Sequence, residues 1–272
     1  VLLALVVPLG IVTNNKMKKI FCIICHKLSN PLLLTVRYLS SFDENIVIIH
    51  VDRKSNMDDF LILRGDRVLF TKIREKVEWG GAGQMLATIA LLKEALAFDF
   101  EYMFLISGDD LPCASNVDID IAIKNIEFKN LVDYQDQRSH FVDPIERVKY
   151  SYPSFFFSKD KKILNKIKCR LFNLFRFFFI NRQFKEIKEK NITFYKGTQW
   201  FSLNKQTVSE LIAFIDSNDW YVSLFSKSFC GDEILFHTAL KLIGRTDFYH
   251  DPLKINDALR YIDWNSGPDY PR

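Results

Sequence analysis

The chain has 272 residues, 48% of them hydrophobic and 26% charged, and its net charge at pH 7 is +4. That length and apolar content allow one large α/β domain, or two small ones, with a sizeable buried core. The charges form no long block of one sign, so the composition gives no reason to expect nucleic acid as a partner.

The five cysteines are odd in number and scattered, which does not fit a disulfide framework and favours a reducing, cytoplasmic compartment. Cys22 and Cys25 form a CxxC pair, but they lie inside the apolar run Ile20–Cys25. A redox pair would follow the strand at the start of a helix. These two thiols are therefore predicted to be buried in a strand.

Residues 1–16 begin with the apolar run Val1–Val12. This run is too short to span a bilayer, and it lacks the preceding basic residue of a signal peptide. We expect an apolar leader or an expression-derived segment here, with the folded domain starting at Met17.

The first part of the domain reads as a β-α-β unit. Apolar, β-rich runs at Lys19–Cys25 and Asn45–His50 predict parallel strands, and Leu32–Leu39 predicts the helix between them. Ligands of open α/β sheets bind at the carboxyl ends of the strands. That rule makes His26 and the cluster Asp52-Arg53-Lys54 candidates for ligand binding, although Asp52 could equally be a turn or cap residue.

A short strand at Arg67–Phe70 and a glycine-rich loop at Val77–Gly83 come next, before an amphipathic helix. Glycine turns at a helix start allow the backbone to approach phosphate or sugar closely. The loop has neither P-loop nor GxGxxG spacing, so alone it is a weak signal. Trp79, Gly80 and Gly81 lie in this loop.

Tyr102–Ile106 predicts another central strand, and Asp109 and Asp110 follow it. Many nucleotide-sugar transferases hold a divalent ion with a DxD at this point, but adjacent carboxylates on extended backbone point to opposite faces. The literal DxD, Asp118-Ile119-Asp120, falls in a predicted helix start. No histidines have metal-ligand spacing, and we expect no metal and no cofactor.

The second part of the chain predicts a strand at Asn130–Tyr134 and then an unusual segment, Lys159–Lys190, that mixes lysine, arginine and phenylalanine. Its apolar runs are too short to cross a membrane. The segment is either a basic, aromatic helix on an anionic membrane surface or a core helix with solvated lysines.

Two turns further on carry the candidate chemistry. Lys196–Leu203 predicts a glycine turn that leads into an aromatic strand, and Cys230–Phe236 predicts a Gly-Asp-Glu turn that leads into a helix. Glu233 would then stand at a helix start beside a polar and aromatic pocket, which suits a general base. The alternative is that this Asp-Glu pair only caps the helix.

The order of these blocks resembles the core-2/I-branching β-1,6-N-acetylglucosaminyltransferase family, which includes peptide O-xylosyltransferases and bacterial members. The resemblance runs from about residue 20 to near the end of the chain. It is carried by these blocks: Cys25-His26-Lys27, His50–Ser55, Val77–Gly83, Leu105–Pro112, Glu146-Arg147, Lys196–Leu203, Gly231-Asp232-Glu233 and Arg260–Trp264.

The resemblance implies a GT-A fold, with a Rossmann-like, mostly parallel sheet flanked by helices, and an inverting transferase that needs no metal. It implies that Glu233 is the catalytic base, that Asp52 contacts the nucleoside and that Arg147 touches the acceptor sugar. Arg272 is the nearest match to the basic residue that holds the diphosphate; the family usually adds a C-terminal lysine to this clamp.

The resemblance also divides residues 17–272 into a nucleotide-sugar-binding half, 17–115, and an acceptor-binding and catalytic half, 116–272. The expected donor-binding residues are His26, Asp52, Arg53, Trp79, Gly80, Gly81, Asp109, Asp110 and Arg272. The expected acceptor-binding residues are Arg147, Gln199, Trp200, Asp232 and Trp264.

The expected reaction moves N-acetylglucosamine in a β-1,6 linkage from a UDP-sugar to a bacterial surface glycan or glycolipid, in the cytoplasm or on the inner face of its membrane. Two alternatives stay open. The donor could be UDP-xylose or UDP-glucose, or the chain could be a non-catalytic module that binds nucleotide or glycan.

Overall fold

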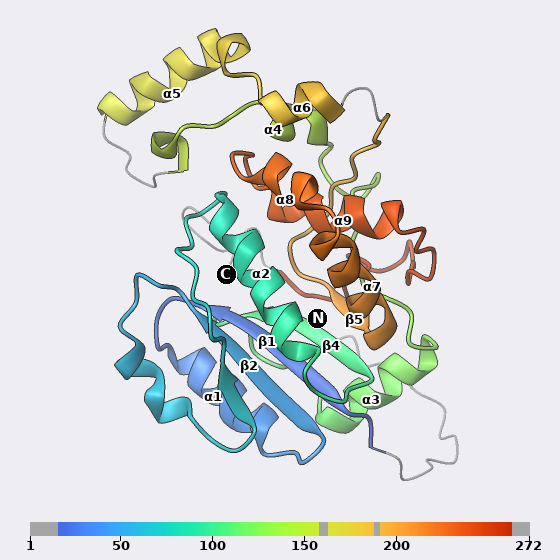
Figure 1. Cartoon of the computed structure of the whole chain (residues 1–272). Coiled ribbons are helices and arrows are strands. Elements are labelled where there is room, and N and C mark those ends of the chain that lie inside the picture. Colours follow the sequence, from blue (N-terminus) through green and yellow to red (C-terminus); the bar gives the residue numbers. More distant parts are fainter. Residues whose placement is uncertain (1–15, 158–162, 188–190, 263–272) are drawn as a thin grey trace.

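The computed structural model describes residues 16–157, 163–187 and 191–262, and its centre is a five-stranded sheet (Figure 1). The strand order is β3-β2-β1-β4-β5, and the bounds are β1 Lys19–Cys25, β2 Asn45–Val51, β3 Val68–Phe70, β4 Tyr102–Ser107 and β5 Ser202–Asn204. The first four strands run parallel and β5 runs antiparallel to β4. The expected α/β architecture with a mostly parallel sheet is confirmed.

The central strand β1 is buried along its whole length, as its unbroken apolar run predicts for a strand covered on both faces. Its register pairs Ile23 with Ile49 of β2 and with Ile106 of β4. This register places the carboxyl ends of three parallel strands at one edge of the sheet, where the side chains that follow them meet.

Helices cover both faces of the sheet. On one face, α1 (Asn30–Ser40) begins where Ser29 accepts a hydrogen bond from the Leu32 amide, and it packs into an apolar cluster with β2 and the 3-10 turn η1 (Met57–Leu63). On the other face lies the larger core. Its helices are α2 (Ala82–Ala95), α7 (Lys205–Asp216), α8 (Asp219–Phe225) and α9 (Asp232–Leu242).

Two predicted strands are shorter in the structure than expected. Asn130–Tyr134 forms only isolated bridges, among them one from Leu131 to Ser202, and the aromatic strand after Gly197 is reduced to β5. Asn130, Leu131 and Tyr134 pair singly with Phe248, Ser202 and Gly197 instead of forming a regular ladder, so an apolar run alone did not reveal their state. The helix α8 was not predicted.

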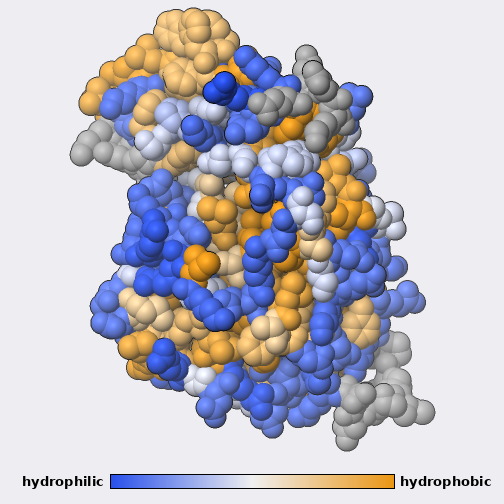
Figure 2. Space-filling view, in the orientation of Figure 1, coloured by the Kyte–Doolittle hydropathy of each residue, from blue (hydrophilic) through white to orange (hydrophobic). Residues whose placement is uncertain are grey.

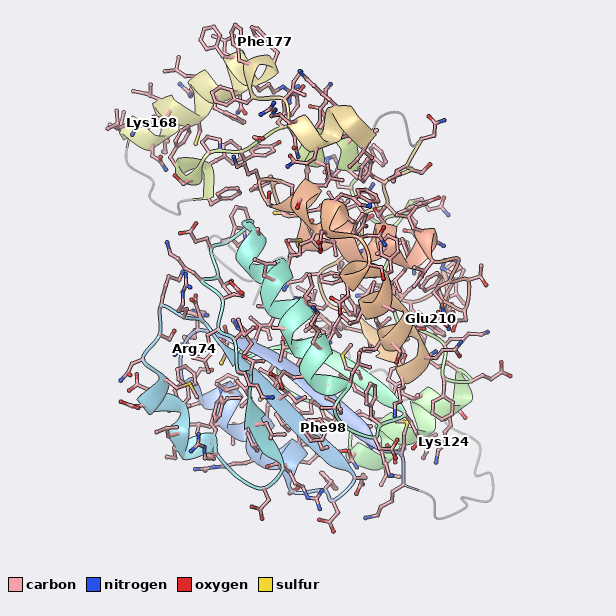
Figure 3. The ribbon with its side chains drawn as sticks, viewed as in Figure 1. Arg74, Phe98, Lys124, Lys168, Phe177 and Glu210 are labelled. Atoms are coloured by element: carbon pink, nitrogen blue, oxygen red, sulfur yellow. The ribbon has the colours of Figure 1, made fainter. Side chains whose placement is uncertain are left out.

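A separate layer lies beyond the helices at the top of Figure 1. It consists of α4 (Pro144–Val148), η2 (Ser154–Phe157), α5 (Ile163–Phe175), η3 (Arg176–Phe179) and α6 (Arg182–Ile187), and α3 (Asn116–Asn125) lies at the opposite end. Figure 3 shows Lys168 and Phe177 projecting from this layer far from the sheet. Within the described residues, no helix has the length and apolarity needed to cross a membrane.

Candidate functional site

The carboxyl ends of β1 and β2 place Asp52 beside the residues that follow β1. Asp52 is 3% exposed, and its amide donates to the carbonyl of Cys25 over 2.8 Å. Its carboxylate accepts hydrogen bonds from the Lys54 and Val77 amides and pairs with the Lys54 ammonium at 3.3 Å. Asp52 therefore organises the turn after β2 and anchors the glycine-rich loop to it.

The neighbouring candidates at this edge are more exposed. His26 is exposed, and its carbonyl accepts from the Ser55 hydroxyl over 2.6 Å. Arg53 is also exposed, and its backbone amide donates to the carbonyl of Glu75. Both side chains are exposed where the chain leaves β1 and β2.

The two acids after β4 point to different partners, as predicted for adjacent carboxylates. Asp109 pairs with Lys27 at 3.4 Å, whereas Asp110 accepts from the Ser107 amide and from Arg260 over 2.9 Å. Arg260 also donates to the Leu105 carbonyl, and its guanidinium carbon lies 5.9 Å from the ring centre of Trp200. Asp110 and Trp200 thus meet through an arginine that the sequence did not single out as a site residue.

The glycine-rich loop joins the strand ends to the turn before α9. The Trp79 ring stands edge-on to Phe229, with ring centres 5.5 Å apart, and the Gly80 carbonyl accepts from the Cys230 amide over 2.7 Å. Gly80 has φ 71°, and a Cβ there would press on the Phe229 ring, so the close contact favours glycine. Gly81 is the N-cap residue of α2.

Glu233 lies in the first turn of α9 between two cations. Its Oε2 atom is 2.5 Å from the Arg147 guanidinium and 3.1 Å from the Lys196 ammonium. Its carbonyl accepts from the Gly197 amide over 3.0 Å, which holds the Lys196-Gly197 turn against the helix start. The Glu233 side chain is 28% exposed, so solvent or a substrate can reach it.

The residue before it has the opposite environment. Asp232 is 6% exposed, and its Oδ1 atom is buried without a hydrogen-bond partner. Burial, and then the neighbouring charge of Glu233, raise the pKa of Asp232 from 3.8 to about 7. The amide nitrogen of Gln199 is likewise buried without a partner. Asp232 is therefore buried beside the partly exposed Glu233.

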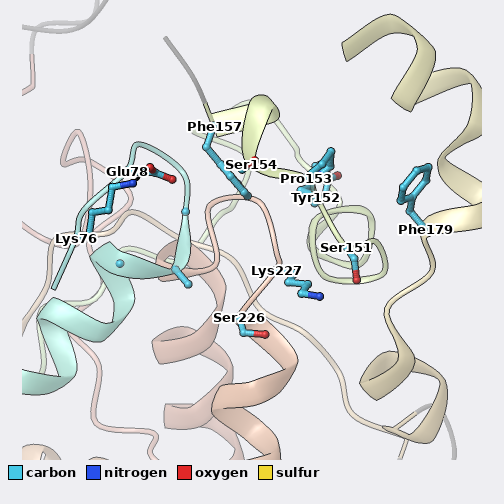
Figure 4. A pocket seen from close by; sticks show the side chains of 13 residues that line it. Lys76, Glu78, Ser151, Tyr152, Pro153, Ser154, Phe157, Phe179, Ser226 and Lys227 are labelled. Carbon is cyan, nitrogen blue, oxygen red and sulfur yellow. Dashed lines mark ion pairs between the residues drawn. The ribbon is translucent and has the colours of Figure 1, made fainter. Parts of the chain in front are cut away.

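A pocket of about 520 Å³ opens near the start of α2 and the end of α8 (Figure 4). Its walls come from the start of α2, from the loop Ser151–Ser154 and from Phe157, Phe179 and Lys227. Phe229 contacts the pocket residue Phe157 and also the Arg147 guanidinium, which lies 5.4 Å from its ring centre. The Phe229 ring therefore links the pocket to the Arg147–Glu233 pair.

One group in the described part of the chain has metal-ligand geometry. Asp136, His250 and Asp257 bring their ligand atoms within 4.8 Å of one another. Arg138 already donates to both carboxylates, over 2.8 Å to each, and His250 lies 2.8 Å from Asp257. The guanidinium supplies the positive charge that a metal would bring, so these residues fit an arginine-centred network better than an ion site.

The remaining acidic and thiol motifs have structural surroundings. Asp118 accepts from the Ser115 hydroxyl at the start of α3, and Asp120 pairs with the buried Lys19 ammonium. Cys22 and Cys25 are buried in β1, as predicted, and desolvation raises the pKa of both thiols, that of Cys25 to about 12. Neither pair has the environment of a reactive CxxC or a DxD.

Among the predicted residues, Arg147 contacts Glu233 directly, and Trp79 and Gly80 contact Phe229 and Cys230 just before it. Asp52 reaches the glycine-rich loop through the Val77 amide. Trp264 and Arg272 lie outside the described residues, as does most of the 1–16 leader. The sequence analysis did not single out Lys196, Phe229 or Arg260. All three stand inside or directly beside a quoted block, and only the fold reveals their partners.

The model of the Core-2/I-Branching enzyme family matches residues 20–272. Among solved structures, 4-diphosphocytidyl-2C-methyl-D-erythritol synthase from Anaerococcus prevotii is similar over 85% of this chain and 84% of its own, at 13% identity and a TM-score of 0.41. The structure of S. aureus TarS is similar over 53% of this chain and 26% of its own, at 15% identity and a TM-score of 0.31. No curated protein sequence matches the chain.

The family match spans almost all of the described residues and includes every block that carried the sequence resemblance. The match agrees with the mostly parallel sheet, whose strand ends carry polar side chains, and it identifies the architecture as a GT-A-like fold. It also implies a nucleotide-sugar donor and a glycan acceptor. The chain therefore belongs to the Core-2/I-branching enzyme family and is a glycosyltransferase.

Proposed function

We propose that this glycosyltransferase inverts the sugar carbon in a single displacement and uses Glu233 as its general base. The observation that carries the proposal is the position of Glu233, partly exposed at the start of α9 between Arg147 and Lys196. Both cations contact the same oxygen, Oε2. In the proposed mechanism the acceptor hydroxyl approaches Oε1 and gives its proton there as it attacks the sugar carbon.

The donor side of the proposal uses the strand ends. Asp52 would contact the nucleoside, and Trp79 would stand near the transferred sugar because its ring reaches the turn before Glu233. A transferase without a metal needs cationic side chains for the leaving diphosphate, and arginine offers a bidentate fork to phosphate oxygens. Arg272 is the residue proposed for that role.

We propose UDP-N-acetylglucosamine as the donor, a β-1,6 linkage as the product and a bacterial surface glycan or glycolipid as the acceptor, with transfer on the cytoplasmic side of the membrane. This choice of sugar and linkage follows the family that the chain belongs to. UDP-xylose and UDP-glucose are the alternative donors. Expected acceptor contacts are Arg147, Gln199, Trp200 and Trp264, with Asp232 supporting them from below.

A panel of UDP-sugars, assayed for hydrolysis by the purified protein with and without EDTA, tests this proposal. We expect turnover of UDP-N-acetylglucosamine above the other donors, unchanged by EDTA. Faster turnover of UDP-xylose or UDP-glucose would identify that sugar nucleotide as the donor. Complete inhibition by EDTA would refute the metal-free mechanism. Binding of UDP without turnover of any donor would favour a non-catalytic module.

A further inference from the structure

The layer farthest from the sheet carries a continuous exposed apolar surface, which we call the α5–η3 face. Figure 2 shows hydrophobic side chains gathered at this end of the molecule. Ile163 and Phe178 are 77% and 74% exposed, and Phe172 is the buried residue of α5. The face consists of Ile163, Leu164, Ile167, Leu171, Leu174, Phe175, Phe177, Phe178 and Phe179.

The helical members of this face form one stripe. At 3.6 residues per turn, the exposed apolar residues of α5 fall within an arc of about 120° around the helix axis. Phe172 lies roughly 120° from the middle of that arc, so the buried ring and the apolar stripe point in different directions. The stripe is therefore a second apolar surface and not the edge of the core.

Basic residues border the stripe on both sides. Lys168 follows one edge of the arc, and Arg170 and Lys166 follow the other, all three of them exposed. From Ile163 to Phe179 the chain has four basic residues, Arg176 included, and no acidic one. A solvated surface helix would normally carry mixed charges opposite its core face, and this segment does not.

Tertiary contacts fix the direction of the stripe. The Phe172 ring packs on Tyr152 and Phe179, with ring centres 5.2 Å and 5.3 Å apart. Arg176 pairs with Glu146 at 2.7 Å, and the Asn165 amide donates to the carbonyl of Phe155. These contacts bind α5 to the protein by one side and leave the apolar stripe facing outward.

We propose that the α5–η3 face docks on the surface of an anionic lipid bilayer, with α5 lying in the interface. Exposed leucine, isoleucine and phenylalanine can enter the acyl boundary, while flanking lysine and arginine meet lipid phosphates. A nucleic-acid partner would need the basic residues but would leave the exposed aliphatic stripe unexplained. A second copy of the chain would bring the same cations together, which opposes self-association.

Docking in this way would hold the catalytic site close to the lipid surface. Phe179 belongs to the α5–η3 face and also lines the pocket beside α2. The rings of Phe172, Tyr152 and Phe229 lie in successive contact, with centres 5.2 Å and 5.6 Å apart, and Phe229 touches Arg147. A lipid-anchored acceptor could then reach Glu233 without leaving the bilayer, a consequence that rests on the proposed function.

Vesicle flotation of the full chain tests the docking itself and requires no activity. We expect binding to phosphatidylcholine vesicles that contain phosphatidylglycerol, and little binding to phosphatidylcholine alone. The triple change Leu164→Gln, Leu174→Gln and Phe178→Gln should abolish flotation. The matched control, Leu34→Gln, Ile62→Gln and Val117→Gln, alters side chains of similar exposure on α1, η1 and α3, and it should float like the wild type.

A second variant separates charge from apolar burial. Changing Lys166, Lys168 and Arg170 to glutamate should weaken binding by on the order of fivefold or more for each charge removed, and added salt should weaken the wild type in the same direction. Unchanged far-UV circular dichroism shows that each variant is folded. Flotation that survives the apolar triple change, or a concentration-dependent dimer abolished by it in the absence of vesicle binding, would overturn the proposal.

Discussion

At the residue scale, the site depends on two adjacent carboxyl groups in opposite surroundings. Glu233 is partly exposed and bound by two cations, whereas Asp232 is buried with one oxygen unpartnered. The two residues are adjacent at the start of α9, but their side chains have different surroundings. The exposed carboxylate is open to solvent or a substrate, whereas the buried one has a raised pKa.

The buried carboxyl should make stability depend on pH. The pKa of Asp232 is raised from 3.8 to about 7, so the folded state holds more protons than the unfolded state between these values. Its contribution is fully present below pH 3.8 and is lost as the pH rises through 7. Asp232→Asn should therefore gain stability over the wild type as the pH rises, by on the order of 4 kcal/mol at alkaline pH.

Urea unfolding of both proteins at pH 5 and pH 8 measures that gain. The control Asp216→Asn removes a carboxylate that is 52% exposed, and it should change little between the two pH values. An equal stability difference between Asp232→Asn and the wild type at both pH values would contradict the assignment.

The Arg260 guanidinium should contribute more to stability than an exposed arginine. Its side chain is 16% exposed, and it binds both Asp110 and the Leu105 carbonyl at the end of β4. Arg260→Met should destabilise the fold by about 2 kcal/mol, because these acceptors lose a charged donor. Arg67→Met, which removes a pair with the exposed Asp43, should cost less than about 1 kcal/mol. Equal midpoints in urea would refute this difference.

At the element scale, the turn before β5 is fixed by close packing around Gly197. A Cβ at this position would overlap the Asp133 carbonyl and the His237 ring. His237 is fully buried, and desolvation lowers its pKa to about 3, so a neutral ring fills this space. The turn that carries Lys196 therefore has no room to shift without moving the backbone of α9 or the chain at Asp133.

Gly197→Ala should destabilise the protein by about 3 kcal/mol or prevent folding, since backbone atoms would have to move. Gly65→Ala is the matched control, because nothing lies within 4 Å of a Cβ there. Thermal unfolding of the two variants should show a large loss for the first and a change near zero for the second. Similar melting temperatures would show that the turn adapts freely.

At the scale of the whole molecule, local sequence patterns predicted the β-α-β unit and the sheet class. The apolar runs of β1, β2 and β4 are local features that tertiary packing did not override. Residues 130–134 form isolated bridges to partners distant in the chain: Gly197, Ser202 of β5 and Phe248. The apolar pattern of this segment does not indicate which distant residues it pairs with.

The candidate site likewise combines features that the local sequence predicts with features that only the fold reveals. Its carboxylates were predicted because they follow strands or open helices, which is a local signal. Arg260 meets Asp110 across 150 residues of chain, and Arg147 meets Glu233 across 86, so only the fold could pair them. Lys196 stood beside the predicted glycine turn, but its approach to Glu233 depends on the Gly197-to-Glu233 backbone bond.

The donor turnover of Glu233→Gln tests the central claim most directly, with binding of the UDP-sugar measured by calorimetry on the same protein. Loss of a general base should lower turnover by about 10²–10⁴-fold and leave donor binding unchanged. Glu210 lies on α7 and also pairs with an arginine, and the control variant Glu210→Gln should keep full turnover. Wild-type turnover by Glu233→Gln, or an equal loss of turnover and donor binding, would contradict the role of Glu233 as the base.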